Sequence, residues 1–248
     1  MKRLRRLYRR LLQLDGFRLR VAKLRWFYFV HVRRRLRTLH ARDAGAATVS
    51  HNVKGMQDLF VQRSLALIRP LVAAITVSRP GGAIEAVTFP GVKVLSVGPR
   101  TEGELLNLVA HGFEPGCVRG LDLISYSPWI DLGDMHAMPY ADNEWDAIVF
   151  GWTLAYSDNK AQAAREIVRV ARPGAIVAIG AEYCCYSNEE LIARHGYLPG
   201  SGERIWKLSD ILDQFDGHID RIFFQHDITP ARSHEEAVAL IAVFSIRK

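Results

Sequence analysis

A glycine and an acidic residue stand at a spacing that suits the binding of a ligand with a ribose. Gly98 follows the apolar run VKVLSV, and Asp122 lies 24 residues beyond it, in the run GLDL. In an open parallel sheet the loop after the first strand brings its backbone close to the ligand, and glycine permits this because it has no Cβ. An acid about 20 residues further on holds ribose hydroxyls. The spacing therefore predicts a ligand site built from Gly98 and Asp122.

Strand and helix patterns alternate around these two residues. Strands alternating with helices indicate a mostly parallel sheet that is covered on both faces. Two final apolar runs are joined by roughly ten residues without a helix, which indicates an antiparallel pair. The predicted strands are 92–97, 117–123, 145–151, 175–181, 221–227 and 237–246, and the predicted helices between them include 104–111 and 160–171.

The first part of the chain has a different character. Residues 2–14 and 17–41 have helical spacing, and we expect Asp15-Gly16 to separate these two helices. Residues 43–56 are small and polar and are predicted to be a linker. A helix is expected over 57–77, with Pro70 kinking or ending it. The expected domains are a basic helical extension at 1–42, the linker at 43–56, and an α/β domain at 57–248.

Longer stretches of the α/β part resemble a known family, the class I S-adenosylmethionine-dependent methyltransferases of the small-molecule type. The resemblance begins with VKVLSVGPRTEGELL and VRGLDL and continues through residues 133–183. The family's acid-rich stretch appears here as Asp134, Pro139, Tyr140, Asp142, Trp145 and Asp146, and its E-x-x-R stretch as Glu166, Arg169, Val170, Arg172, Pro173 and Gly174.

The resemblance implies a fold, a cofactor and a set of binding residues. The fold is a Rossmann-like, seven-stranded, mostly parallel sheet with an antiparallel last strand inserted beside the fifth, and the cofactor is S-adenosylmethionine. Asp122 is expected to hold the ribose and Asp134 the adenine amino group, with Met135 against the ring, whereas the stretch from Glu166 to Gly174 is structural. The expected cofactor-binding residues are Gly98, Pro99, Arg100, Glu102, Asp122, Leu123, Asp134, Met135 and Gly151.

The glycine loop departs from the family pattern D-x-G-x-G-x-G. Ser96 stands at the acid, Arg100 and Glu102 replace two glycines, and Pro99 removes one N–H donor. Arg100 suits the carboxylate of the cofactor's methionine end, and Glu102 suits its ammonium. In the alternatives, Arg100 and Glu102 are solvated or paired with each other, or the loop no longer binds cofactor and the domain is a non-catalytic scaffold.

Methyl transfer demands few catalytic groups, because the sulfonium is already activated and alignment supplies most of the acceleration. A base is needed only if the acceptor must lose a proton. His136 and Tyr156 are weak candidates for that base, since a lone histidine is more often structural. The three cysteines have no CxxC spacing, and no metal site is predicted. The acceptor should lie against Gly151, Trp152, Tyr156, Glu182 and Tyr183.

Charge is divided unevenly along the chain. Residues 1–42 carry 15 Lys and Arg against one acid, so the remaining residues carry 18 basic against 25 acidic side chains. A basic helix with aromatic and aliphatic residues suits an anionic membrane surface. Nucleic acid, and packing on the domain or on a second copy in a homo-oligomer, are the alternatives. The apolar content favours lipid over RNA. The absence of an N-P-P-[YF] motif after the fourth strand argues against amino-group methylation of bases by the common route.

Together these patterns predict a methyltransferase with a small-molecule, lipid or glycan-type acceptor. A cytoplasmic location is expected, because no secretory signal and no apolar run of about 20 residues is present. Attachment to the inner face of a membrane is the finer expectation. An RNA methyltransferase that uses the basic arm is a further alternative.

Overall fold

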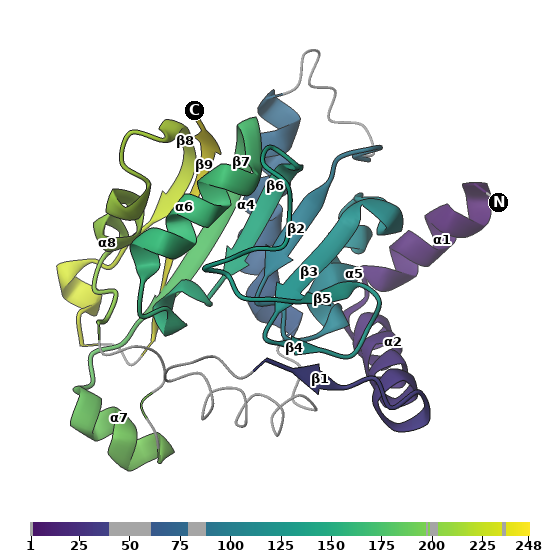
Figure 1. Ribbon diagram of the computed structural model, residues 1–248, viewed down its shortest axis with the longest axis horizontal. Coiled ribbons are helices and arrows are strands. Elements are labelled where there is room, and N and C mark those ends of the chain that lie inside the picture. Colours follow the sequence, from purple (N-terminus) through teal and green to yellow (C-terminus); the bar gives the residue numbers. More distant parts are fainter. Residues whose placement is uncertain (1, 40–60, 79–87, 197, 199–202, 235–236) are drawn as a thin grey trace.

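The computed structural model describes residues 2–39, 61–78, 88–196, 198, 203–234 and 237–248. Within these residues the main sheet consists of β2 (Val94–Val97), β3 (Val118–Asp122), β5 (Ile130–Leu132), β6 (Trp145–Gly151), β7 (Ala171–Tyr183), β8 (Ile219–His226) and β9 (Val238–Ile246). Their order is β5-β3-β2-β6-β7-β9-β8 (Figure 1).

β9 runs antiparallel to both of its neighbours, β7 and β8, whereas the pairs from β5 to β7 are parallel. The prediction of a seven-stranded, mostly parallel sheet with an antiparallel last strand is therefore confirmed. The inserted strand lies beside β7, as the family resemblance implied.

Helices cover both faces of this sheet because successive strand residues point in opposite directions. In β2, Val94 packs into a core with α4 (Val61–Ser78) and α5 (Glu102–Ala110), whereas Leu95 packs into a second core with α6 (Lys160–Val170). The second core is completed by α8 (Leu208–Leu212) and the 3₁₀ turn η5 (Asp213–Phe215). The other short elements are η3 (Pro115–Cys117), η4 (Leu154–Tyr156), α7 (Asn188–His195) and η6 (Pro230–Arg232).

The helix α4 runs through Pro70, so of the two alternatives predicted for Pro70, a kink or an end of the helix, the end is wrong. Leu67, Ile68 and Leu71 on either side of the proline are fully buried. Their burial holds the two halves in one helix, which offsets the hydrogen bond that proline cannot donate. The predicted start of this helix at 57–60, like the predicted linker at 43–56, lies outside the described residues.

The N-terminal arm, residues 2–39, consists of α1 (Lys2–Leu12), α2 (Asp15–Phe27), the π-helical turn η1 (Tyr28–Val32) and β1 (Arg37–Thr38). Its two helices lie against α5 (Figure 1), with Leu12 and Ala22 fully buried in the first core. The arm ends at the sheet edge, where β1 pairs antiparallel with β4 (Ile124–Ser125). Packing on the domain, one of the three alternatives for the arm, is thus part of this structure.

The break between α1 and α2 falls at Gln13-Leu14, two residues earlier than expected. Asp15 and Gly16 begin α2 instead of separating the two helices. Arg18 explains this, because its guanidinium is buried and donates to Leu12 O at 2.6 Å while also pairing with Asp15. Asp15 also places a negative charge in the first turn, where the helix dipole favours it.

Candidate functional site

Three strands of the parallel part end at one place. Gly98 follows β2, Asp122 is the last residue of β3, and Gly151 is the last residue of β6. The loop after β2 is joined to β3 by two hydrogen bonds, from Gly98 N to Leu121 O and from Arg100 N to Asp122 Oδ2, each 2.8 Å long. The glycine loop and the spaced acid therefore lie together, at the edge where open α/β sheets bind their ligands.

Asp122 is half-buried, and backbone groups hold its carboxylate. Oδ2 accepts from Arg100 N, and Oδ1 accepts from Ile124 N at 3.0 Å. Burial raises the pKa of this carboxyl to about 6, although these hydrogen bonds oppose the shift. Each carboxylate oxygen has a second lone pair, so both remain able to accept a hydroxyl.

Gly98 is required by a protein contact. Its φ is +72°, and a Cβ there would lie 2.0 Å from the Thr153 hydroxyl. Thr153 comes from the loop after β6, and its hydroxyl donates to Gly151 O at 2.9 Å. This threonine fills the space beside Gly98, where the ligand was expected to approach the backbone.

Two residues other than glycine have left-handed backbone at this edge. Arg100 has φ +55° and Trp152 has φ +56°. Such a conformation costs a residue with a Cβ about 1–2 kcal/mol. Arg100 stands where the family pattern has glycine, so the loop keeps the backbone shape that glycine would give while carrying a guanidinium.

Glu102 has a different environment from the one expected. Its side chain is fully buried and accepts two hydrogen bonds from Arg25 of α2, and one from the Ser127 hydroxyl. Arg25 in turn lies over the Trp129 ring, with its guanidinium carbon 4.8 Å from the ring centroid. Glu102 is thus neither solvated nor paired with Arg100, and we do not retain it as the partner of a ligand ammonium.

Glu104, which the sequence analysis did not select, lies close to the same edge. It accepts a hydrogen bond from the hydroxyl of Ser96, a fully buried residue of β2. Burial raises the pKa of Glu104 to about 7. Ser96 was the available clue in the sequence, because it stands at a strand position where the family carries an acid. An acid, Glu104, lies eight residues later, in the first turn of the next helix.

On the far side of Asp122, the loop after β5 carries Asp134, Met135 and His136. The His136 ring nitrogens lie 2.7 Å from Asp134 Oδ1 and 2.7 Å from the Ser157 hydroxyl. Ser157 is fully buried, so this Ser-His-Asp array cannot present a nucleophile to a substrate. His136 instead orients Asp134, whose side chain is 43% exposed.

The arm closes the same side of the site. Leu39 N donates to Leu123 O at 2.8 Å, and β1 pairs with β4 immediately after Asp122. The two expected cofactor-binding residues Asp122 and Leu123 thus lie beside the end of the arm.

Comparisons with known proteins agree with this geometry. Residues 119–179, which run from β3 to β7, match the family model described as a methyltransferase domain. No curated protein matches the chain in sequence. Residues 119–179 are thus recognised as a methyltransferase domain, and this match together with the strand order supports the class I S-adenosylmethionine-dependent methyltransferase superfamily.

Two solved structures share the fold of this methyltransferase domain. One is the complex between the Haloferax volcanii Trm112 methyltransferase activator and the putative methyltransferase, with TM-score 0.55 and 16% identity over 84% of this chain and 98% of that chain. The other is Burkholderia thailandensis 1,6-didemethyltoxoflavin-N1-methyltransferase with bound 1,6-didemethyltoxoflavin and S-adenosylhomocysteine, with TM-score 0.52 and 13% identity over 86% and 93%. At these identities the likeness concerns the fold.

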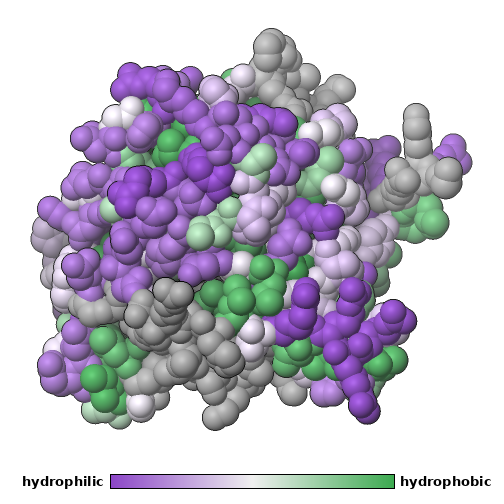
Figure 2. Space-filling model, viewed as in Figure 1, coloured by the Kyte–Doolittle hydropathy of each residue, from purple (hydrophilic) through white to green (hydrophobic). Residues whose placement is uncertain are grey.

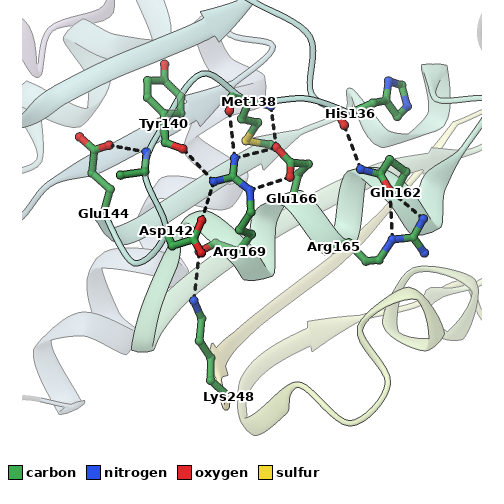
Figure 3. Close-up of polar contacts among 11 residues, drawn as sticks. His136, Met138, Tyr140, Asp142, Glu144, Gln162, Arg165, Glu166, Arg169 and Lys248 are labelled. Atoms are coloured by element: carbon green, nitrogen blue, oxygen red, sulfur yellow. Dashed lines mark hydrogen bonds and ion pairs between the residues drawn. The ribbon is translucent and has the colours of Figure 1, made fainter.

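The E-x-x-R stretch of this domain braces the segment from Met138 to Asp142 (Figure 3), which lies in the same loop as Asp134. Arg169 donates to Glu166, to Asp142, and to the carbonyl oxygens of Met138 and Tyr140, at 2.7–2.9 Å. Glu166 also accepts from Met138 N at 2.6 Å. One guanidinium on α6 thereby holds several turns of the loop between β5 and β6.

The residues expected to face the acceptor lie at the ends of β6 and β7. Glu182 and Tyr156 are half-buried. Tyr183 is 9% exposed, donates its hydroxyl to Ser233 O at 2.6 Å and packs edge-on against Trp206. Tyr183 is thus occupied with the protein, whereas Glu182 and Tyr156 keep partial access to the surface.

Proposed function

We propose that this chain binds S-adenosylmethionine at the carboxyl ends of β2, β3 and β6 and catalyses methyl transfer to an acceptor. The hydrogen bond from Arg100 N to Asp122 Oδ2 carries the proposal, because it joins the variant glycine loop to the spaced acid in a methyltransferase sheet. Asp122 accepts the ribose hydroxyls, Arg100 pairs with the ligand carboxylate, and Asp134 accepts from the adenine amino group beside Met135.

The residues of this chain bind and align, and they contribute little chemistry of their own. The bound cofactor supplies a methyl group on a positively charged sulfur, which needs no further activation. The half-buried Glu182 and Tyr156 border the acceptor and hold it in line with that methyl group. Alignment of this kind supplies several kcal/mol of the barrier reduction, about 7–11 kcal/mol in favourable intramolecular cases. His136 orients Asp134 and takes no part in proton transfer.

Thermal unfolding with and without S-adenosylhomocysteine tests the binding site. Ligand at about 100 times its Kd stabilises a protein by about 2.7 kcal/mol, which raises Tm by several degrees. We expect this rise in the wild type and in Asp220→Asn, a matched change on the distant strand β8, and no rise in Asp122→Ala. An equal rise in all three proteins would contradict the assignment of Asp122.

We further propose that the acceptor is lipid-linked or glycan-type and that the arm binds the anionic membrane surface where it lies. Apolar side chains project from the arm into solvent: Leu24 is 69% exposed, Phe27 is 55%, Tyr28 is 45% and Val32 is 59%. Exposed basic residues lie among them: Arg20, Lys23, Arg33, Arg34, Arg35 and Arg37. Figure 2 shows strongly hydrophilic side chains beside hydrophobic ones around α2 and β1, at the lower right.

This combination suits an anionic lipid surface better than RNA. Apolar side chains enter the interface while basic side chains remain at the headgroups, and each basic residue adds about 1 kcal/mol near such a surface. RNA would use the charges and leave the apolar residues in water. Within the described residues, no helix is long and apolar enough to cross a bilayer.

Liposome flotation with phosphatidylserine-containing vesicles tests the membrane proposal. We expect the wild type to float and Leu24→Asn/Phe27→Asn to remain at the bottom. Ile222→Asn/Phe224→Asn, two exposed apolar residues on the edge strand β8 that are each 42% exposed, is the matched control and should float. Equal flotation of all three proteins would contradict the proposal, as would tight binding to RNA without any flotation.

A second candidate function is a non-catalytic scaffold. Thr153 favours it, because this side chain fills the space beside Gly98 where the sequence analysis expected the ligand to approach. The same thermal unfolding experiment separates the two functions. A scaffold that has lost its cofactor gives no rise in Tm with S-adenosylhomocysteine in any variant, including the wild type.

A further inference from the structure

Glu104 places a carboxylate near the carboxyl ends of the sheet strands. It comes from the helix α5, whereas the family pattern has its acid on the strand. The residue lies in the first turn of α5, and its Oε1 accepts a hydrogen bond from the Ser96 hydroxyl of β2. Ser96 is fully buried, so the hydroxyl pins one end of the carboxylate to the strand. The negative charge that the family pattern places on the strand is therefore carried here by the following helix.

The second oxygen of Glu104 points toward the end of β6. It lies 3.8 Å from the position that a Cβ would occupy at Gly151. The same position lies 3.3 Å from Cδ1 of the fully buried Leu67, so Glu104 Oε2 and Leu67 are the two side-chain groups that border Gly151. The carboxylate oxygen is the hydrogen-bond acceptor of this pair, and it suits a cation that donates hydrogen bonds.

The other two carboxylates near the loop already have strong donors. Glu102 is buried against Arg25 and Ser127, and Asp122 accepts from two backbone N–H groups. In the described part of the chain, the hydroxyl of Ser96 is the one hydrogen-bond donor to Glu104. Among the residues that the structure describes, no arginine, lysine or backbone amide donates a hydrogen bond to Glu104, although the charge of Arg100 opposes the rise in its pKa that burial causes.

We propose that Glu104, held by Ser96, binds the ammonium of the ligand's amino-acid end beside Gly151. This inference rests on the proposed function, since it assigns one more contact of the same cofactor site. The inference assigns the ammonium to Glu104 instead of Glu102, the residue expected from the sequence, which lies two positions earlier on α5. Arg100 and Glu104 then lie on the carboxylate and the ammonium of one amino-acid group.

A bound ammonium also explains how a charge is tolerated there. Burial raises the pKa of the Glu104 carboxyl to about 7, so at neutral pH the free protein holds it partly protonated. A cation within hydrogen-bond distance favours the ionised form. Ligand binding and ionisation of Glu104 therefore support each other.

Calorimetric titration with two ligands tests the inference. S-adenosylhomocysteine carries the amino-acid end, whereas 5′-methylthioadenosine lacks both its ammonium and its carboxylate. We expect Glu104→Gln to weaken S-adenosylhomocysteine about ten- to hundredfold and to leave 5′-methylthioadenosine unchanged. Glu114→Gln, which precedes β3 at the opposite end of the sheet, should change neither affinity.

Ser96→Ala provides a second variant that keeps the carboxylate. Loss of the hydroxyl donor should weaken S-adenosylhomocysteine about threefold to tenfold and again spare 5′-methylthioadenosine. Wild-type affinity for S-adenosylhomocysteine in both Glu104→Gln and Ser96→Ala would overturn the inference, as would an equal loss of both ligands in either folded variant. A wild type that binds neither ligand would overturn the proposed function, and this inference with it.

Discussion

Arg25 of the arm and Glu102 of α5 form a two-pronged ion pair, with Arg25 Nη2 2.8 Å from Glu102 Oε1 and Arg25 Nε on the other carboxylate oxygen. Glu102 is fully buried, and Arg25 is one-third exposed. Because Glu102 directly follows the loop Gly98–Thr101, the pair joins the basic arm to the wall of the proposed ligand site. The arm is therefore a structural part of the methyltransferase domain, whatever its outer surface binds.

Removing one member of this pair should destabilise the protein strongly. Arg25→Met leaves the Glu102 carboxylate buried without its cation, and loss of one partner of a buried ion pair costs about 3–5 kcal/mol. Arg25→Met/Glu102→Gln should recover part of that loss, because no isolated charge remains. Lys23→Met, an exposed change on the same helix, should stay within about 0.5 kcal/mol. Chemical denaturation of the four proteins measures these differences, and equal stability of Arg25→Met and Lys23→Met would contradict the account.

Removing the Arg169 side chain should also destabilise the protein. Arg165, one helical turn earlier on α6, provides the control. Arg169→Ala removes hydrogen bonds to Glu166, Asp142 and two backbone carbonyls, and should lower the free energy of unfolding by about 2–4 kcal/mol. Arg165 is exposed on the same helix, and within the described residues its hydrogen bonds go to Gln162 alone. Arg165→Ala should therefore cost less than about 0.5 kcal/mol. A loss of similar size in both variants would rule out the brace.

Two substitutions of Arg100 distinguish the strain in its backbone from the binding of ligand by its side chain. Its φ of +55° costs a residue with a Cβ about 1–2 kcal/mol, which glycine avoids at a smaller entropic cost. Arg100→Gly should therefore unfold at a Tm equal to or a few degrees above wild type, whereas Arg100→Ala should gain nothing. Both variants should bind S-adenosylhomocysteine about tenfold more weakly, because the guanidinium is gone. Scanning calorimetry and titration measure the two effects, and unchanged affinity in both would refute the carboxylate contact.

The free energy of unfolding should fall as pH rises from about 4.5 to about 7, because Glu104 binds its proton more tightly in the folded state. Its pKa is about 7 in the folded protein and 4.5 as a free side chain, so the folded state holds the proton more tightly. Stability associated with that proton is present below about pH 4.5 and is lost by about pH 7. The charged groups that influence Glu104 are Asp122, whose own pKa is raised to about 6, and Arg100.

Glu104→Gln isolates this contribution, because glutamine does not titrate. The difference in unfolding free energy between Glu104→Gln and wild type should shift in favour of the variant by about 1–3 kcal/mol between pH 4.5 and 7.5. Denaturant unfolding at several pH values measures the shift. A constant difference across this range would show that Glu104 titrates at its ordinary pKa.

The sequence was sufficient for the sheet and for one contact of the site. Apolar runs between helical segments specify strands locally, and the 24-residue spacing of Gly98 and Asp122 placed the loop beside the acid, as the Arg100–Asp122 hydrogen bond shows. These features depend on period and spacing, which a single sequence carries. The antiparallel last strand followed for the same reason, because a connection without a helix cannot cross over the sheet.

Partners far apart in the chain could not be predicted. Arg25 and Glu102 are 77 residues apart, and neither the arm's charge nor the loop's composition specifies which arginine reaches which acid. Thr153 on Gly98 is a similar case, because a glycine in a loop leaves open whether a ligand or a side chain lies beside it. Pro70 is a different case. The local rule that proline ends a helix fails there, because burial of the neighbouring side chains keeps α4 continuous.

The central claim is that the variant loop still binds the cofactor, and isothermal titration of the full chain with S-adenosylhomocysteine tests it most directly. The account predicts one ligand bound per chain, and a binding heat that disappears in Asp122→Ala but persists in Asp220→Asn. The absence of binding heat for folded wild-type protein at millimolar ligand would contradict it.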